Sequence, residues 1–193
     1  MNRIKTARHA NPSALAVFLA GYIFFVGGTP AAPAQNAKFT VGSATGIPNA
    51  EIKLPVYLTL SAGEQFERVV ATIDYPRTLA FSRSEAAKDG PAKGLSILVK
   101  ETAPQTGAKT KRLEVTVKGE QGKTLPTGML GSLFFGVDKK AIEQMMSIPV
   151  AEAKGFPKGS ETTVALHGDA GSVVIYLSIP KQEPLAGCFF FSH

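Results

Sequence analysis

Apolar and polar residues alternate one by one over several short stretches of the chain. The alternation is clearest in Glu51–Leu60 (EIKLPVYLTL), Glu67–Tyr75 (ERVVATIDY) and Thr110–Lys118 (TKRLEVTVK). A period of two places successive side chains on opposite faces of an extended chain, so each stretch predicts a half-buried β-strand. Pro55 has no backbone donor, which predicts either an edge position for the first of these strands or a proline amide that faces outward.

Shorter apolar runs separated by Gly, Pro and polar residues predict the remaining strands. These runs are Lys38–Gly42, Thr78–Ser82, Gly94–Glu101, Gly128–Asp138, Ser147–Ala151, Thr162–Leu166 and Gly171–Ile179. The glycines within Gly128–Asp138 indicate close packing or bulges. Lys139–Met146 (KKAIEQMM) has helical propensity and is expected to form two helical turns. About nine short strands and no long amphipathic helix predict an all-β fold, a jelly-roll or Ig-like β-sandwich.

The first 34 residues have a different character. Met1–Ser13 is polar and basic, Ala14–Gly28 is apolar and uncharged, and Thr29–Ala34 (TPAAPA) supplies small residues in an A-x-A arrangement. This order is typical of a secretory signal, with cleavage expected between Ala34 and Gln35. A retained membrane anchor is the alternative, although the apolar run is shorter than the roughly 20 residues that a spanning helix needs. We therefore expect a signal peptide over 1–34, a sandwich domain over 35–180 and a tail over 181–193, with no membrane span left after cleavage.

The charge balance argues against a nucleic-acid partner. The formal charge of the whole chain is +6, from 21 basic and 15 acidic residues. Removing Arg3, Lys5 and Arg8 with the signal leaves 18 basic residues against the same 15 acids, a charge of about +3. Nucleic-acid binding needs a concentrated basic stripe. The densest basic cluster, around Lys111, is equally well explained as the solvated face of a strand.

Motifs for catalysis or metal binding are absent from the sequence. After the signal only His167 and His193 remain, and neither belongs to a spaced metal-ligand set. The acidic residues are scattered, without the paired carboxylates that glycoside hydrolysis requires. The pattern therefore predicts a protein that is not an enzyme and has no cofactor or metal. Asp74 and Tyr75 are the candidate binding residues, and an Asx-type turn bond before Pro76 is the alternative role for Asp74.

The C-terminal segment Pro184–His193 (PLAGCFFFSH) combines a lone cysteine with three consecutive phenylalanines. Cys188 has no second cysteine in the chain, so no intramolecular disulfide can form. Leaving a phenylalanine exposed instead of buried costs about 1.5–3 kcal/mol. We expect the tail to pack on its own domain, to meet a partner, or to serve as a sorting or attachment signal in which Cys188 is modified.

Three stretches follow one another with the order and spacing of motifs in cohesin modules. They are Val41–Val56 (VGSATGIPNAEIKLPV), Val70–Leu79 (VATIDYPRTL) and Thr127–Phe135 (TGMLGSLFF). Together they make the chain resemble the cohesin family, within the wider group of bacterial carbohydrate-binding-like sandwiches. The sequence departs from the family pattern at Asn49-Ala50, where Gly-Asp is usual, and at Asp74, which here precedes the tyrosine instead of following it.

The resemblance implies a nine-stranded jelly-roll sandwich that is exported to the extracellular space, the periplasm or the cell surface. It further implies a non-catalytic module that binds a protein partner, such as a dockerin-like domain, or a polysaccharide through an exposed sheet face. The alternative hypothesis is a structural subunit of a cell envelope or pilus-like assembly that uses its Phe-rich C-terminal tail.

Overall fold

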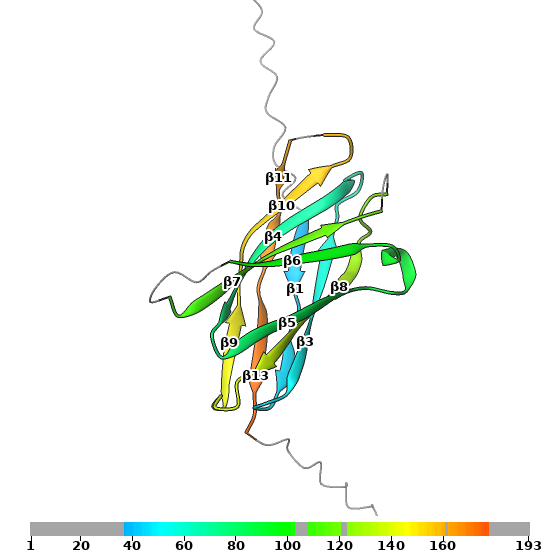
Figure 1. Cartoon of the computed structure of the whole chain (residues 1–193). Helices are drawn as coiled ribbons and strands as arrows, with labels where there is room; N and C mark the ends of the chain where they lie inside the picture. The colour runs from blue at the N-terminus through cyan, green and yellow to red at the C-terminus, as the bar shows by residue number, and fades with distance from the viewer. Residues whose placement is uncertain (1–36, 103–107, 121–122, 161, 178–193) are drawn as a thin grey trace, which may run out of the picture. The chain divides into compact units, whose positions relative to one another are not determined.

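The computed structural model describes residues 37–102, 108–120, 123–160 and 162–177 (Figure 1). The predicted signal segment 1–34 and the whole predicted tail 181–193, including Cys188, lie outside the described residues. Within the described ranges the chain forms β-strands and one short 3-10 helix, Gly90–Ala92. No helix in this part of the chain is long and apolar enough to cross a membrane.

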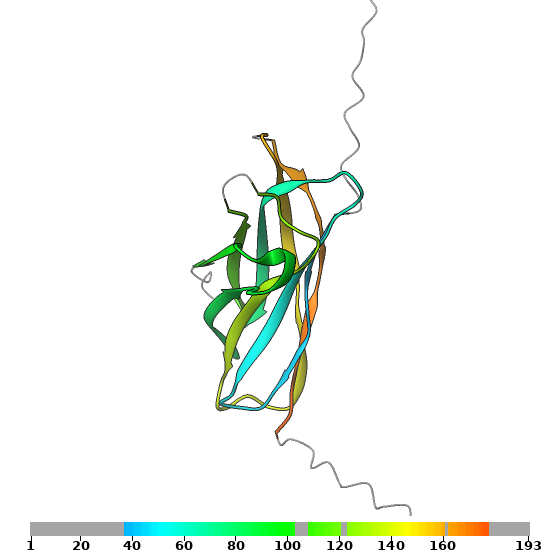
Figure 2. The same ribbon diagram turned by 90° about the vertical axis from the view of Figure 1, so that its right-hand side faces the viewer.

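The strands are arranged in three sheets. Their bounds are β1 Lys38–Val41, β2 Ala44–Gly46, β3 Glu51–Thr59, β4 Phe66–Pro76, β5 Leu79–Ala86, β6 Ser96–Thr102, β7 Thr110–Lys118, β8 Gly128–Val137, β9 Gln144–Ile148, β10 Val150–Pro157, β11 Val164–Ala165, β12 His167–Asp169 and β13 Gly171–Ile175. The two five-stranded sheets have the orders β12-β1-β3-β8-β5 and β11-β10-β4-β7-β6, and the third sheet is β2-β13-β9 (Figures 1 and 2). The predicted all-β sandwich is confirmed.

The core lies between the two five-stranded sheets. Every second side chain of β4 from Val69 to Tyr75 is fully buried, and β3 and β7 show the same alternation. The ring of Tyr75 on β4 meets the ring of Phe135 on β8 edge to face, with 5.1 Å between their centroids. Each large apolar side chain buried in this layer contributes about 1.5–3 kcal/mol. The alternation in the sequence therefore predicts correctly which side chains of these strands are buried in the core and which face solvent.

Pro55 lies in an interior strand, so of the two alternatives predicted for it the edge position is wrong. β3 pairs with β1 on one side and with β8 on the other. The Pro55 carbonyl accepts a hydrogen bond from the Gly42 N–H at 2.7 Å, and in an antiparallel pair a residue turns its nitrogen to the same side as its carbonyl. The Pro55 nitrogen, which has no hydrogen to donate, thus faces the break between β1 and β2, where strand pairing is already interrupted.

The predicted helix over Lys139–Met146 is also wrong, because residues 144–148 form strand β9. β9 pairs antiparallel with β13, which places Met146 opposite Val173 and Ile148 opposite Gly171. Met146 and Ile148 are buried, whereas Met145, which precedes Met146, is exposed. Pairing with a strand more than 20 residues further along the chain overrides the local helical propensity.

The glycines of β8 differ in how closely other atoms approach them. A Cβ added to Gly131 would lie 2.5 Å from Ile97 Cδ1 and would also collide with the backbone of Glu85 and Ala86. A Cβ added to Gly136 on the same strand would meet nothing nearer than the Ala80 carbonyl oxygen at 4.0 Å. The predicted close packing therefore holds at Gly131 and does not hold at Gly136.

We expect Gly131→Ala to lower the free energy of unfolding by about 1–3 kcal/mol, because neighbouring strands must move to accept the methyl group. Gly136→Ala is the matched control and is expected to leave stability unchanged or slightly higher. Urea unfolding followed by circular dichroism measures both variants. Equal stability losses in the two variants would contradict this account of β8.

Candidate binding face

The outer face of sheet β11-β10-β4-β7-β6 has a row at its centre in which three of the four residues present apolar groups. Lys154, Val70, Thr116 and Leu98 occupy paired positions on β10, β4, β7 and β6. We call these four residues the central row. Leu98 is 66% exposed, while Val70 and Thr116 are half-buried between their neighbours. An exposed leucine beside a valine and a threonine methyl makes a continuous apolar strip on an otherwise polar face.

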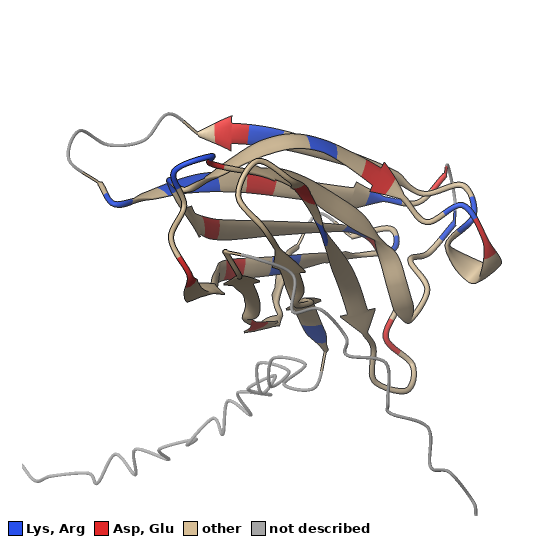
Figure 3. Ribbon diagram, turned by 90° about the horizontal axis from the view of Figure 1, so that it is seen from below, with Lys and Arg blue, Asp and Glu red and all other residues tan. Residues whose placement is uncertain are grey.

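On each side of the central row lies a row that includes charged side chains, and we call these two rows the charged rows. One row contains Phe156, Arg68, Lys118 and Ser96, and the other contains Glu152, Thr72, Glu114 and Lys100. The Arg68 guanidinium carbon lies 3.7 Å from the centroid of the Phe156 ring and covers its face. Basic and acidic residues are interspersed over the strands, so the sheet does not present one sign of charge (Figure 3).

Asp74 extends this outer face towards the end of β4. Its carboxylate accepts two hydrogen bonds from Arg112 on β7, from Nε at 2.6 Å and from Nη2 at 2.9 Å. The hydrogen bonds from Arg112 to Asp74 raise the pKa of that guanidinium above its usual value. The Asp74 carboxylate thus pairs across strands, in place of the Asx-type turn bond considered from the sequence. Its side chain remains 20% exposed.

Tyr75 points the other way, into the core. Its hydroxyl donates a hydrogen bond to Glu101 Oε1 on β6 at 2.5 Å, and Lys111 Nζ lies 3.4 Å from the same oxygen. Burial and the Glu101 carboxylate raise the pKa of Tyr75. The same hydrogen bond, with Lys111 nearby, lowers the pKa of Glu101. The two candidate residues are therefore neighbours in sequence but lie on opposite faces of the sheet.

The central row was not predicted from the sequence. Alternation correctly assigned Val70 and Thr116 to the solvent face of their strands, but it could not show that they lie side by side. Leu98 stands in the apolar run Ile97–Val99, which has no polar position to mark a wet face. The only available signal was that a solvated β-strand carries apolar side chains at Val70 and Leu98.

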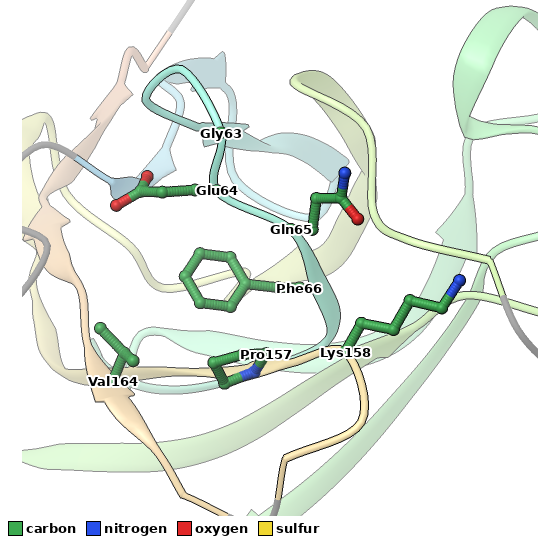
Figure 4. A pocket seen from close by; sticks show the side chains of 7 residues that line it. All are labelled: Gly63, Glu64, Gln65, Phe66, Pro157, Lys158 and Val164. Carbon is green, nitrogen blue, oxygen red and sulfur yellow. The ribbon is translucent and has the colours of Figure 1, made fainter.

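One pocket of about 310 Å³ lies at the end of this sheet, lined by residues 63–66, Pro157, Lys158 and Val164. The Phe66 ring lines it, and the side chains of Glu64 and Lys158 point in opposite directions (Figure 4). The Glu64 carboxylate accepts a hydrogen bond from the Ser61 N–H at 2.8 Å. A single carboxylate lines this pocket. Over the described ranges, no three His, Cys, Asp or Glu residues gather to hold a metal ion.

Solved structures of cohesin modules share this architecture. A structure of a type I cohesin–dockerin complex from Clostridium thermocellum matches at 14% identity and TM-score 0.54, over 72% of this chain and 99% of the matched chain. A non-cellulosomal cohesin from the archaeon Archaeoglobus fulgidus matches at 14% identity and TM-score 0.54, over 72% and 91%. The cohesin module of a family 33 glycoside hydrolase from Clostridium perfringens matches at 13% identity and TM-score 0.54, over 75% and 98%.

No family model matches the chain, and no curated protein matches it in sequence. The structural matches nevertheless cover nearly the whole length of each cohesin. The described domain is a cohesin-type β-sandwich, and the resemblance seen in the sequence is confirmed at the level of the fold.

The buried Tyr75 predicts a loss of stability at high pH. In the folded protein Tyr75 keeps its proton at pH values at which an unfolded tyrosine, whose pKa is near 10, has lost it. Above about pH 10 this group therefore lowers the free energy of unfolding by up to ~1.4 kcal/mol per pH unit. Tyr75→Phe is expected to be less stable than the natural protein at pH 7, and the gap is expected to close as the pH rises past 10.

Urea unfolding at pH values from 7 to about 11 measures this difference, since tyrosines in unfolded chains titrate within that range. Tyr57→Phe is the control, because Tyr57 is 36% exposed on the outer face of the other five-stranded sheet. It is expected to retain the pH dependence of the natural protein. A constant gap between Tyr75→Phe and the natural protein at all pH values would show that the Tyr75 proton is not linked to folding.

Proposed function

We propose that this chain is a non-catalytic module that binds a protein partner through the central row and its two charged rows. The observation that carries the proposal is Leu98, a large apolar side chain that is 66% exposed at the end of an apolar strip. Protein interfaces have an apolar centre and a polar rim. The outer face of this sheet has the same arrangement, because its charged side chains lie on both sides of the row.

The chemistry of this face favours a protein over a polysaccharide. A flat surface that holds a sugar polymer relies on exposed aromatic rings, and the chain has no tryptophan. The one ring in the charged rows, Phe156, is covered by Arg68. The cohesin fold and the match to a cohesin–dockerin complex support a dockerin-like partner. Such a partner would place apolar side chains on the central row and charged groups against Lys118, Glu114 and Lys100.

The N-terminal sequence supports action outside the cytoplasm. Residues 1–34 have the basic, apolar and small-residue order of a secretory signal. We infer that the mature domain works at the cell surface, in the periplasm or in the medium.

Substitution of Leu98 tests the proposed face. We expect the chain to bind at least one member of a panel of immobilised dockerin modules in biolayer interferometry. Leu98→Asp is expected to weaken that binding by about tenfold or more, because it places a charge in the apolar centre of the interface. The side chain is exposed, so the thermal midpoint is expected to stay within a few degrees of the natural value.

Ile142→Asp is the matched control, because Ile142 is 67% exposed and lies outside this sheet. Its affinity is expected to equal that of the natural protein. The proposal fails if no dockerin module binds, or if Leu98→Asp binds as tightly as Ile142→Asp does.

A second function, as a structural subunit of a surface assembly, is favoured by one further observation. Ile142, Met145 and Leu177 are 67%, 75% and 63% exposed, and Tyr176 beside them is 36% exposed. Met145 lies on β9 and Tyr176 directly follows β13, the strand that pairs with β9. These exposed apolar side chains would suit contact with a neighbouring subunit.

Deletion of Cys188–His193 tests this second function. If the Phe-rich segment joins subunits, the shortened protein is expected to lose its assembly and its retention at the cell surface, measured by fractionation and native electrophoresis. Binding to a dockerin module is expected to survive the deletion. Unchanged localisation and assembly would eliminate the structural role.

A further inference from the structure

A larger pocket of about 450 Å³ lies on the outer face of the other five-stranded sheet. Strand β8 lines it together with Lys53 of β3 and Glu85 of β5, and residues 86–92 add a wall. The Ala87 N–H donates a hydrogen bond to the Leu130 carbonyl at 2.9 Å, which ties that wall to β8. The pocket is therefore formed before any ligand arrives. It belongs to a different sheet from the central row.

Ser132 is the unusual residue of this pocket. Leu133 and Phe135 are buried in the core, so the intervening Phe134 and the preceding Ser132 face the outer side of β8. The Arg83 guanidinium lies over the Phe134 ring at 4.0 Å, on the same side. Ser132 is 1% exposed, and its hydroxyl has no hydrogen-bond partner among the described residues. Because Ser132 lines the pocket, a group held there can satisfy that hydroxyl.

Charges around the pocket balance at short range. Lys53 and Glu85 come from the strands on either side of β8, and Lys88 and Asp89 are consecutive in the wall. The two cations and two anions leave the lining with no net charge, which favours neither an anion nor a cation. They do offer hydrogen-bond donors and acceptors, and Met129 adds an apolar surface. An uncharged ligand with many hydroxyl groups fits this lining.

We propose that this pocket binds one or two rings of a neutral saccharide. A sugar hydroxyl accepts a hydrogen bond from Ser132 Oγ or donates one to it, while neighbouring hydroxyls bond to Lys53, Glu85 and Asp89. The C–H face of a ring lies against Met129. The volume falls within the range of small-molecule sites, and a pocket of this kind surrounds its ligand with hydrogen bonds instead of stacking it on an aromatic ring.

Titration of the full-length protein, labelled with ¹⁵N, with glucose, galactose, maltose and cellobiose tests the site by NMR. At least one of these sugars is expected to cause saturable shifts in the backbone amides of residues 85–92 and 128–132. Glucuronate, glucosamine and glycine are the charged probes and are expected to bind more weakly. The absence of saturable shifts with every neutral sugar up to about 50 mM, well above the millimolar range of weak binding, would overturn the proposal. Tighter binding of a charged probe would overturn it too.

Ser132→Ala separates a ligand contact from a structural role. Removing a buried hydroxyl without a partner is expected to leave the thermal midpoint of the sugar-free protein equal or higher. The same change is expected to weaken sugar binding by about tenfold, the loss of one good hydrogen bond. Ser172→Ala is the control, because the Ser172 hydroxyl donates to Ser43 Oγ at 2.8 Å on the three-stranded sheet. Its affinity is expected to be unchanged.

Equal sugar affinity in Ser132→Ala and Ser172→Ala would show that Ser132 does not contact the ligand and would contradict the proposal. The outcome is independent of dockerin binding, because Leu98 and the pocket lie on different sheets. Leu98→Asp is therefore expected to bind the sugar normally, and Ser132→Ala is expected to bind a dockerin module normally.

Discussion

The register of β4 against its neighbours is the constraint on which both faces of this sheet depend. Successive side chains of a strand alternate, so burial of Ile73 and Tyr75 obliges Thr72 and Asp74 to face solvent. A slip of one residue would carry the Asp74 carboxylate into the core, away from Arg112, at a large cost in desolvation. The apolar layer between the sheets therefore also positions the surface residues proposed to bind.

Polar contacts at the end of β4 reinforce that register from both sides of the sheet. Asp74 and Arg112 join β4 to β7 on the outer face. The Tyr75 hydroxyl joins β4 to Glu101 on β6, across β7, and Lys111 of β7 lies close to the same carboxylate. Three strands are thus held together where β4 ends, close to the proposed binding face. The two neighbouring residues singled out from the sequence have positioning roles in the structure on opposite faces.

In a β-sandwich, one face of each sheet packs against the core and the other, outer face is available for binding. On the β4 sheet the outer face bears the central row, which suits a broad contact with another protein. On the β8 sheet the segment of residues 86–92 contributes a wall to the pocket that contains Ser132. The two proposed sites therefore differ in kind. The pocket that contains Ser132 is lined partly by a segment that follows a strand, whereas the face with the central row consists of strand residues alone.

The sequence by itself determined the alternating strands β3, β4 and β7 and their two faces, because alternation is a local property of an extended chain. It also carried the cohesin resemblance, whose fold the structure shares. Only the tertiary structure decided that β3 is interior despite Pro55, that Met146 belongs to a strand and not a helix, and that Leu98 lies beside Thr116 and Val70. Those outcomes depend on pairing between segments far apart in the chain. The burial of Ser132 likewise depends on β3, β5 and the segment that follows β5, which no pattern within β8 could reveal.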